Sequence, residues 1–197
     1  MTVACCLCLA LLAGPVRPEE SAKNPAEARP MEPTAAGKPL SYWERALGDK
    51  KSRDHKNAPL ALATIGAPAV PVLSRTLAGR DPSLRIAASL ALSRMGREAR
   101  GAVPALFKAL DDDNRHVRVL SAQTLVSVGE RPGELVAVLV QWLDSTDPVL
   151  RVTAFGTLGR LGPAGKPAVP ALRRHLQGKD SDARKLAAEA LKEIETP

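Results

Sequence analysis

The fold is decided by the stretch AVPALFKALDDDNRHVRVLSAQTLVSVG, residues 102–129. Its apolar residues recur at spacings of three and four, which predicts two short amphipathic helices joined by a polar turn. Shifted by the interval that separates Arg85 from Arg118, the same pattern returns once before this stretch and twice after it. A period of about 33 residues is typical of a helical solenoid, in which neighbouring helix pairs cover one another's apolar stripes.

The leucine register and the turn chemistry define about five units. The first helix of each full unit carries a leucine at one position, and the second helix carries another: Leu73, Leu106, Leu139 and Leu172, then Leu92, Leu125, Leu158 and Leu191. Asp-Pro pairs at 81–82 and 147–148 combine a helix cap with a proline suited to the first turn. We place the units at residues 40–66, 69–96, 102–129, 135–162 and 168–195.

Two units depart from this pattern. In the first, His55 stands where the other units have arginine, and we expect Pro59 to interrupt the second helix. In the last, Lys185, Glu189 and Lys192 give the second helix a charged outer face, which predicts a C-terminal cap. No alternating run of β-branched residues bounded by turn signals occurs, so the fold class is all-α.

The repeat resembles the short HEAT-like repeats known from phycobilisome lyases. The matching motifs are the AVPxL of the first helix, the Asp-x-x-x-Arg turn, and the ALxxxG that ends the second helix, as in Ala91–Gly96. The resemblance extends over residues 40–194. It implies a right-handed α-α superhelix with the second helices lining the concave side. Its functional implication is broad, because such arrays serve as scaffolds, adaptors, lyase subunits and occasional enzymes.

Residues 1–39 stand apart from the array. Val3–Ala13 is an apolar run of 11 residues, about half of the roughly 20 that span a bilayer. We therefore predict a signal peptide over residues 1–14, with export to the periplasm or envelope. No basic residue precedes the run and Pro15 follows it, so a cytoplasmic protein with an unusual leader is the alternative. The Pro-rich residues 15–39 predict a disordered linker.

The charge of +7 belongs to the array and does not by itself predict nucleic-acid binding. Basic residues fall at turns and on first helices, among them Arg97, Lys108 and Arg174, while the inner wall formed by the second helices lacks both basic density and a set of stacking aromatics. All three cysteines lie near the amino terminus, at positions 5, 6 and 8, so cleavage of the signal would leave no thiol. Nucleic-acid binding is therefore the less favoured use of the charge.

The most regular polar feature is an arginine ladder, four arginines spaced at the period of the repeat: Arg85, Arg118, Arg151 and Arg184. Each follows a turn residue by four positions, and these turn residues are Asp81, Asn114, Asp147 and Asp180. Four guanidinium groups in a row could bind phosphates or an acidic peptide. The family resemblance implies instead that they pair within and between neighbouring repeats, and we favour this structural role.

A less regular feature predicts the binding surface. Solvent positions of the second helices are mostly uncharged here, and we name six residues as a protein-binding concave face: Ile86, Leu90, Val119, Val126, Val152 and Phe155. Gly156 and Gly159 would let another backbone come close. Contiguous exposed apolar surface marks protein interfaces. The alternative is that superhelical curvature buries these side chains between adjacent helices.

No catalytic, metal or cofactor constellation is evident. The histidines His55, His116 and His175 stand far apart in the sequence, and no His-Glu dipeptide or glycine-rich phosphate loop occurs. We therefore expect a non-catalytic scaffold or adaptor that binds a protein or peptide and needs no cofactor. A subunit of an enzyme, such as a bilin lyase, is the alternative, and the oligomeric state stays open.

Overall fold

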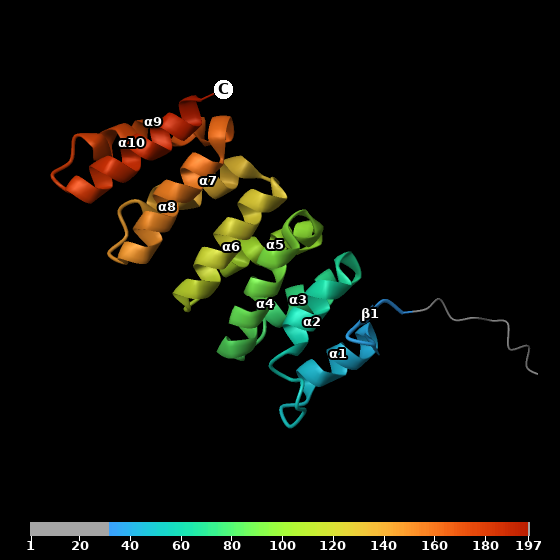
Figure 1. The fold of residues 1–197 in the computed structure, drawn as a ribbon. Helices are drawn as coiled ribbons and strands as arrows, with labels where there is room; N and C mark the ends of the chain where they lie inside the picture. The colour runs from blue at the N-terminus through green and yellow to red at the C-terminus, as the bar shows by residue number, and fades with distance from the viewer. Residues whose placement is uncertain (1–31, 197) are drawn as a thin grey trace, which may run out of the picture. The chain divides into compact units, whose positions relative to one another are not determined.

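The computed structural model describes residues 32–196, so the predicted signal peptide and residues 15–31 of the predicted linker lie outside the described residues. The described chain is an all-α helical repeat solenoid (Figure 1). Its α-helices are α1 Leu40–Gly48, α2 Ala58–Ile65, α3 Val70–Leu77, α4 Pro82–Met95, α5 Val103–Ala109, α6 Arg115–Val128, α7 Pro132–Trp142, α8 Pro148–Arg160, α9 Val169–Leu176 and α10 Ser181–Glu195. Three 3-10 turns precede first helices: η1 Ala67–Ala69, η2 Gly96–Ala102 and η3 Gly162–Ala168.

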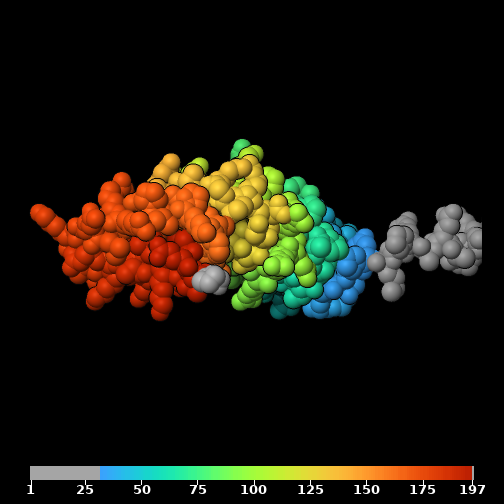
Figure 2. All heavy atoms as spheres, turned by 90° about the horizontal axis from the view of Figure 1, so that it is seen from above, coloured from blue at the N-terminus to red at the C-terminus, as the bar shows by residue number. Residues whose placement is uncertain are grey.

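Each first helix packs against the second helix of its own repeat, which gives two layers of helices. The repeats follow one another in chain order (Figure 2). The second helices α2, α4, α6, α8 and α10 each pack directly against the next along the array. The leucine register predicted from the sequence forms the core between the layers: Leu73, Leu106, Leu139 and Leu172 are fully buried, as are Leu92 and Leu158. Each buried leucine contributes about 1.5–3 kcal/mol, so the apolar stripe of every repeat stabilises its neighbours.

Polar caps set the helix ends. The four residues that precede α4, α6, α8 and α10 each accept a hydrogen bond of 2.9 Å from the backbone N–H two residues further on: Asp81, Asn114, Asp147 and Asp180. The glycines that follow α4, α6 and α8 or lie just beyond have positive φ: Gly96, Gly129 and Gly162. Only glycine adopts this backbone without strain, so these positions end the second helices.

The first and fourth units differ from the expected helix bounds. Pro59 does not interrupt the second helix of the first unit, because it is the second residue of α2, where its missing N–H needs no partner. In the fourth unit α7 begins at Pro132, ahead of the expected start at Leu135. Arg131 precedes it in the left-handed region, with φ of 53°.

Residues 33–39, which we expected to belong to the disordered linker, form a cap on the first repeat. Strands β1 Thr34–Ala35 and β2 Lys38–Pro39 pair antiparallel. The indole Nε1 of Trp43 donates a 3.1 Å hydrogen bond to the carbonyl of Ala35, and both residues are buried. The linker prediction was wrong here because such short strands leave no alternating pattern, and their order depends on the distant Trp43 ring.

The cap is held to the α1–α2 loop by one carboxylate. Asp54 accepts hydrogen bonds of 2.6 Å from Lys38 Nζ and from the Tyr42 hydroxyl. The bond from Lys38, with a smaller effect from Tyr42, lowers the pKa of Asp54 below its ordinary value.

This cap is expected to loosen in acid. A carboxyl whose pKa is lowered by folding contributes stability above its unfolded pKa of about 4, and that contribution is lost as the pH falls through the lower folded pKa. The change Asp54→Asn should therefore destabilise the first repeat at pH 6 and leave less further loss at pH 3 than the wild type shows. NMR signals of the α1 amides in urea titrations at both pH values measure this. Asp111→Asn, at an exposed position in another repeat, is the control; equal pH profiles for Asp54→Asn and the wild type would contradict the prediction.

None of the helices within residues 32–196 is both long enough and apolar enough to cross a membrane.

Candidate functional site

The exposed apolar surface of the solenoid lies on α8. Val152 exposes 53% of its surface and Val149 39%, and these are the two large apolar residues that stand exposed within residues 32–196. Gly156 and Arg160 follow on the same side of α8 and are also exposed. Because residues three and four apart share one side of a helix, this side presents two valines, a glycine and then a basic residue to solvent.

The six residues predicted as the binding face divide into three groups: one is exposed, four are half-buried and one is buried. Val152 is exposed. Four are half-buried, and of these Ile86, Val119 and Val126 pack against the core while Leu90 does not. Packing against the core therefore covers part of the predicted binding face, in the direction of the alternative interpretation.

Phe155 is not a surface residue, and its inclusion in the binding face was wrong. It is 1% exposed, and its ring meets the His175 ring edge-on at 5.4 Å between centroids. The neighbours in register, Ser89 and Ala122, are fully buried as well. Position 155 points between the two layers, and helical spacing from Val152 alone does not reveal this.

The two glycines of α8 have different surroundings. A Cβ at Gly156 would meet nothing within 4 Å, so the helix surface is open there. A Cβ at Gly159 would lie 3.3 Å from Cα of Ala190, because α10 packs closely on this residue. Gly159 therefore serves the contact between the last two repeats, and Gly156 alone stays accessible to another molecule.

We call the surface that remains the second-helix face, composed of Ile86, Leu90, Val119, Val126, Val149, Val152 and Gly156. Its edge at the C-terminal ends of α4 and α8 is basic, through Arg94 and Arg160. Neither arginine forms an ion pair within residues 32–196. On α10 the equivalent positions are charged, so the apolar area ends at α8.

The arginine ladder joins successive repeats. Arg85 binds Asp112 of the next repeat through two contacts, Nε–Oδ2 at 2.7 Å and Nη2–Oδ1 at 3.2 Å. This carboxylate raises the pKa of Arg85. Asp112, rather than the register-matched Asn114, is the partner because an amide lacks the charge that a guanidinium pairs with.

Arg118 and Arg151 follow the same plan with looser geometry, whereas Arg184 contacts the turn of its own repeat. Arg118 Nη1 donates to the carbonyls of Asp112 at 2.6 Å and Asp113 at 3.1 Å, and its Nη2 lies 3.8 Å from Asp147 of the next repeat. Arg151 lies 3.9 Å from Asp180. Arg184 donates at 2.9 Å to the carbonyls of the turn before α10, Gly178 and Lys179. Asp81 caps α4. Arg85 and Arg118 are therefore largely covered by their carboxylate and carbonyl partners, whereas Arg151 and Arg184 are more exposed.

The pKa of Asp180 is lowered by its environment. The backbone N–H groups of Ala183 and Asp182, which it caps, have the largest effects, and Arg151 adds a smaller one. The capping carboxylate thus serves both the start of α10 and the contact between repeats.

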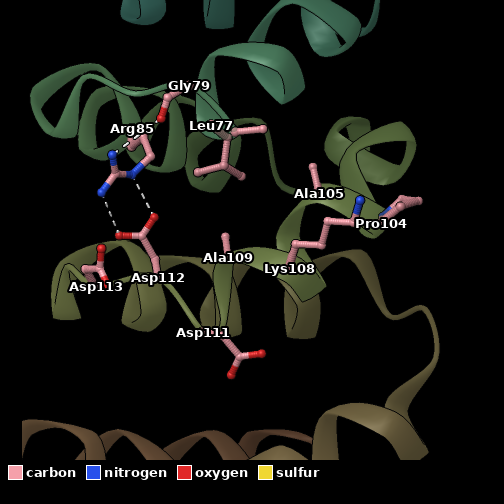
Figure 3. Close-up of a pocket in the computed structure, with 11 residues that line it drawn as sticks. Leu77, Gly79, Arg85, Pro104, Ala105, Lys108, Ala109, Asp111, Asp112 and Asp113 are labelled. Carbon is pink, nitrogen blue, oxygen red and sulfur yellow. Dashed lines mark hydrogen bonds and ion pairs between the residues drawn. The ribbon is translucent and has the colours of Figure 1, made fainter.

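A second candidate site lies on the other side of the array, between first helices. A groove of about 500 Å³ runs between α3 and α5 (Figure 3). Leu77, Ala105 and Ala109 form its apolar centre, the Arg85–Asp112 pair closes one end, and Lys108 stands at the other. We call it the α3/α5 groove. A smaller groove of about 300 Å³ lies one repeat earlier, where Val72, Arg75 and Thr76 of α3 face Leu47 of α1.

Sequence reasoning missed these grooves, although the signal was present. One register position, repeated at the period of the array, holds the side chains Thr76, Ala109, Trp142 and His175. The two smaller ones line the open grooves. Comparing residue size at equivalent positions would have pointed to them.

The comparisons with known proteins agree on the fold. Residues 136–197 match the family described as HEAT repeats. No curated protein sequence matches the chain. Among solved structures, the complex of CpcE and CpcF of phycocyanin lyase from Nostoc sp. is similar with a TM-score of 0.60 and 23% identity, covering 89% of this chain and 70% of that one.

Two designed proteins are also similar. An engineered protein matches with a TM-score of 0.58 and 25% identity, over 79% of this chain and 78% of that one. A designed armadillo repeat protein in complex with the peptide (KR)4 matches with a TM-score of 0.55 and 20% identity, over 79% and 81%. The described chain is thus a solenoid of the HEAT and armadillo kind.

Proposed function

We propose that this protein is a non-catalytic scaffold or adaptor that binds a segment of another protein through the second-helix face. The observation that carries the proposal is the exposure of Val149 and Val152 beside the open surface at Gly156. Exposing two neighbouring valine side chains to water is unfavourable for the folded protein, and exposed apolar surface of this kind is typical of interaction sites. Half-buried Ile86, Leu90 and Val119 extend the same surface over α4 and α6.

The fold supports this proposal. Solenoids of stacked helix pairs present extended surfaces on which a partner chain can lie across several repeats. The designed armadillo protein with its (KR)4 peptide is one structure of this general shape that holds a peptide. The more specific assignment to phycobilisome-lyase-type repeats is part of our proposal and rests on the AVPxL and ALxxxG motifs.

Export to the periplasm or envelope and the lack of a cofactor also belong to the proposal. The apolar run Val3–Ala13 supports export. Fractionation of the producing cells, with detection of the chain by an antibody, tests the location.

The binding test compares matched glutamate variants. Val152→Glu is expected to reduce capture of the partner by about tenfold or more, because binding would bury an unpaired carboxylate at a cost of about 2 kcal/mol or more. Ala137→Glu, at an exposed position on first helix α7, introduces the same charge outside the face and should leave capture unchanged. Affinity purification with mass spectrometry, on separate cytoplasmic and envelope fractions, measures the captured protein.

Circular dichroism and thermal unfolding accompany the test. Val152 is exposed, so Val152→Glu should change the free energy of unfolding by about 0.5 kcal/mol or less. A partner captured equally by the wild type and by Val152→Glu would overturn the proposal, as would loss of the helical spectrum in that variant.

A further inference from the structure

Each groove between successive first helices contains the same register position, held by Thr76, Ala109, Trp142 or His175. In the later repeats the side chain at this position is large. His175 of α9 occupies the α7/α9 position, where its Nε2 lies 3.3 Å from Asp144 and its ring contacts Phe155. Trp142 holds the same register position on α7 and is buried. Ala109, at this position on α5, is too small to fill the space, and the α3/α5 groove stays open at about 500 Å³.

A second register position on the first helices is basic in three repeats and holds Arg75, Lys108 and Arg174. In two of the grooves an acidic residue of one repeat faces a basic residue on the first helix of the next. Glu44 pairs with Arg75 across the α1/α3 groove, and Asp144 pairs with Arg174 at 2.9 Å across the α7/α9 groove. Lys108 is the residue of α5 in register with Arg174. The residue in register with Asp144 is Ala78, which has no carboxylate to offer.

Lys108 therefore stands at the end of the groove as an exposed cation, and it forms no ion pair within residues 32–196. Figure 3 shows Asp111 turned away from Leu77 and Arg85, toward the side of the following repeat. Asp112 is engaged by Arg85 at the opposite end of the groove. Asp113 lies beside Asp112 at that same end (Figure 3). The Lys108 end of the α3/α5 groove thus lacks two things that the α7/α9 groove contains, a bulky side chain and a carboxylate that pairs with the basic residue.

We propose that the α3/α5 groove is a second binding site, which takes a protein segment carrying a large aromatic side chain next to an acidic residue. The aromatic ring lies over Leu77, Ala105 and Ala109, in the space that Trp142 and His175 fill by register in the later repeats. The carboxylate pairs with Lys108, as Asp144 pairs with Arg174. This site is separate from the second-helix face and goes beyond the function proposed for that face.

The test uses three blocked tetrapeptides and the full chain labelled with ¹⁵N. Acetyl-Gly-Trp-Glu-Gly-amide should shift the NMR signals of Ala78, Gly79, Ala105 and Ala109 at millimolar concentration. The Gln analogue should bind about two- to fivefold more weakly, since an exposed ion pair contributes a factor of about this size. The analogue with alanine in place of tryptophan should cause no shifts in these signals.

Variants assign the effect to the groove. Ala109→Trp fills the space and should abolish the shifts, and Lys108→Gln should remove the preference for Glu over Gln. Ala78→Asp places a carboxylate of the protein itself at an exposed position beside Lys108, so it should weaken binding of the Glu peptide without altering the core. This variant still tests the proposal if Ala109→Trp does not fold. Val152→Glu, on the second-helix face, should bind the peptide as the wild type does.

Two results would overturn the proposal. One is binding of the Glu peptide that Ala109→Trp and Ala78→Asp both leave intact. The other is equal binding of the Glu and Gln peptides to the wild type. Neither result concerns the second-helix face, and a failed Val152→Glu capture test would leave this site untouched.

Discussion

Replacing Arg85 with alanine is expected to lower the free energy of unfolding of the solenoid by about 3 kcal/mol. The side chains of Arg85 and Asp112 are only 14% and 10% exposed, and two nitrogen–oxygen contacts join them. Removing the guanidinium leaves the mostly buried Asp112 carboxylate without a countercharge, with the backbone N–H of Asn114 as its remaining partner at 2.8 Å. Such an uncompensated charge is destabilising by several kcal/mol in measured cases, more than the lost attraction alone.

Arg151→Ala is the matched control, because Arg151 holds the same register position two repeats later. Its contact with Asp180 is 3.9 Å long, and the two side chains are 39% and 51% exposed. An exposed pair of this kind contributes up to about 1 kcal/mol. The ladder residues are equivalent in the sequence, so the difference in stability between the two variants is a prediction of the structure alone.

Urea unfolding followed by circular dichroism measures both variants. Repeat arrays unfold through partly folded states, so the curves are fitted with a nearest-neighbour description and not with a single two-state transition. The double variant Arg85→Ala with Asp112→Ala should recover part of the loss, because the unpaired carboxylate is gone. Equal decreases in the free energy of unfolding for Arg85→Ala and Arg151→Ala would contradict the prediction, because the buried pair would then contribute no more stability than the exposed pair.

The repeat and its core were predictable because they depend on local periodicity. Leucines recur at the positions of Leu106 and Leu125 in every full unit, and the structure buries both of these residues. The caps were predictable for the same reason, since Asp147 needs only the next few backbone N–H groups to act.

What could not be predicted depends on contacts between distant residues. Phe155 faces the space between the two layers, as Ser89 and Ala122 do in register, and His175 of the next repeat lies against its ring. Residues 33–39 are ordered because Trp43 donates to Ala35. The partner of Arg85 across the repeat boundary is the charged Asp112 and not the register-matched amide Asn114. The spacing of residues along the chain does not predict which of these distant contacts form.

The glycines of the last two repeats give the second large effect, with opposite signs at two positions. Gly165→Ala is expected to lower the free energy of unfolding by about 2–3 kcal/mol. Its Cβ would lie 2.7 Å from the carbonyl oxygen of Leu158 and 3.1 Å from the Ile194 side chain. The carbonyl belongs to α8 and cannot move without disturbing that helix, so η3 has to shift instead.

Gly156→Ala is the matched change and should raise the free energy of unfolding by about 0.5–1 kcal/mol. Gly156 lies inside α8, and a Cβ there would meet nothing within 4 Å. Alanine is the better helix former, because it restricts the unfolded backbone without a clash. Urea unfolding of both variants measures the difference, and a loss of stability in Gly156→Ala would contradict this account of the α8 surface.

The same variant connects stability to the proposed function. A glycine at the exposed position 156 makes α8 less stable than alanine would, and no contact within residues 32–196 requires it there. A partner backbone that approaches α8 closely beside Val152 would supply one, because a methyl group at position 156 would then stand in its way. Gly156→Ala is therefore expected to gain stability while losing capture of the partner, a combination that a purely structural glycine could not produce. Unchanged capture would mean that the partner contacts the valines and keeps its backbone away from Gly156.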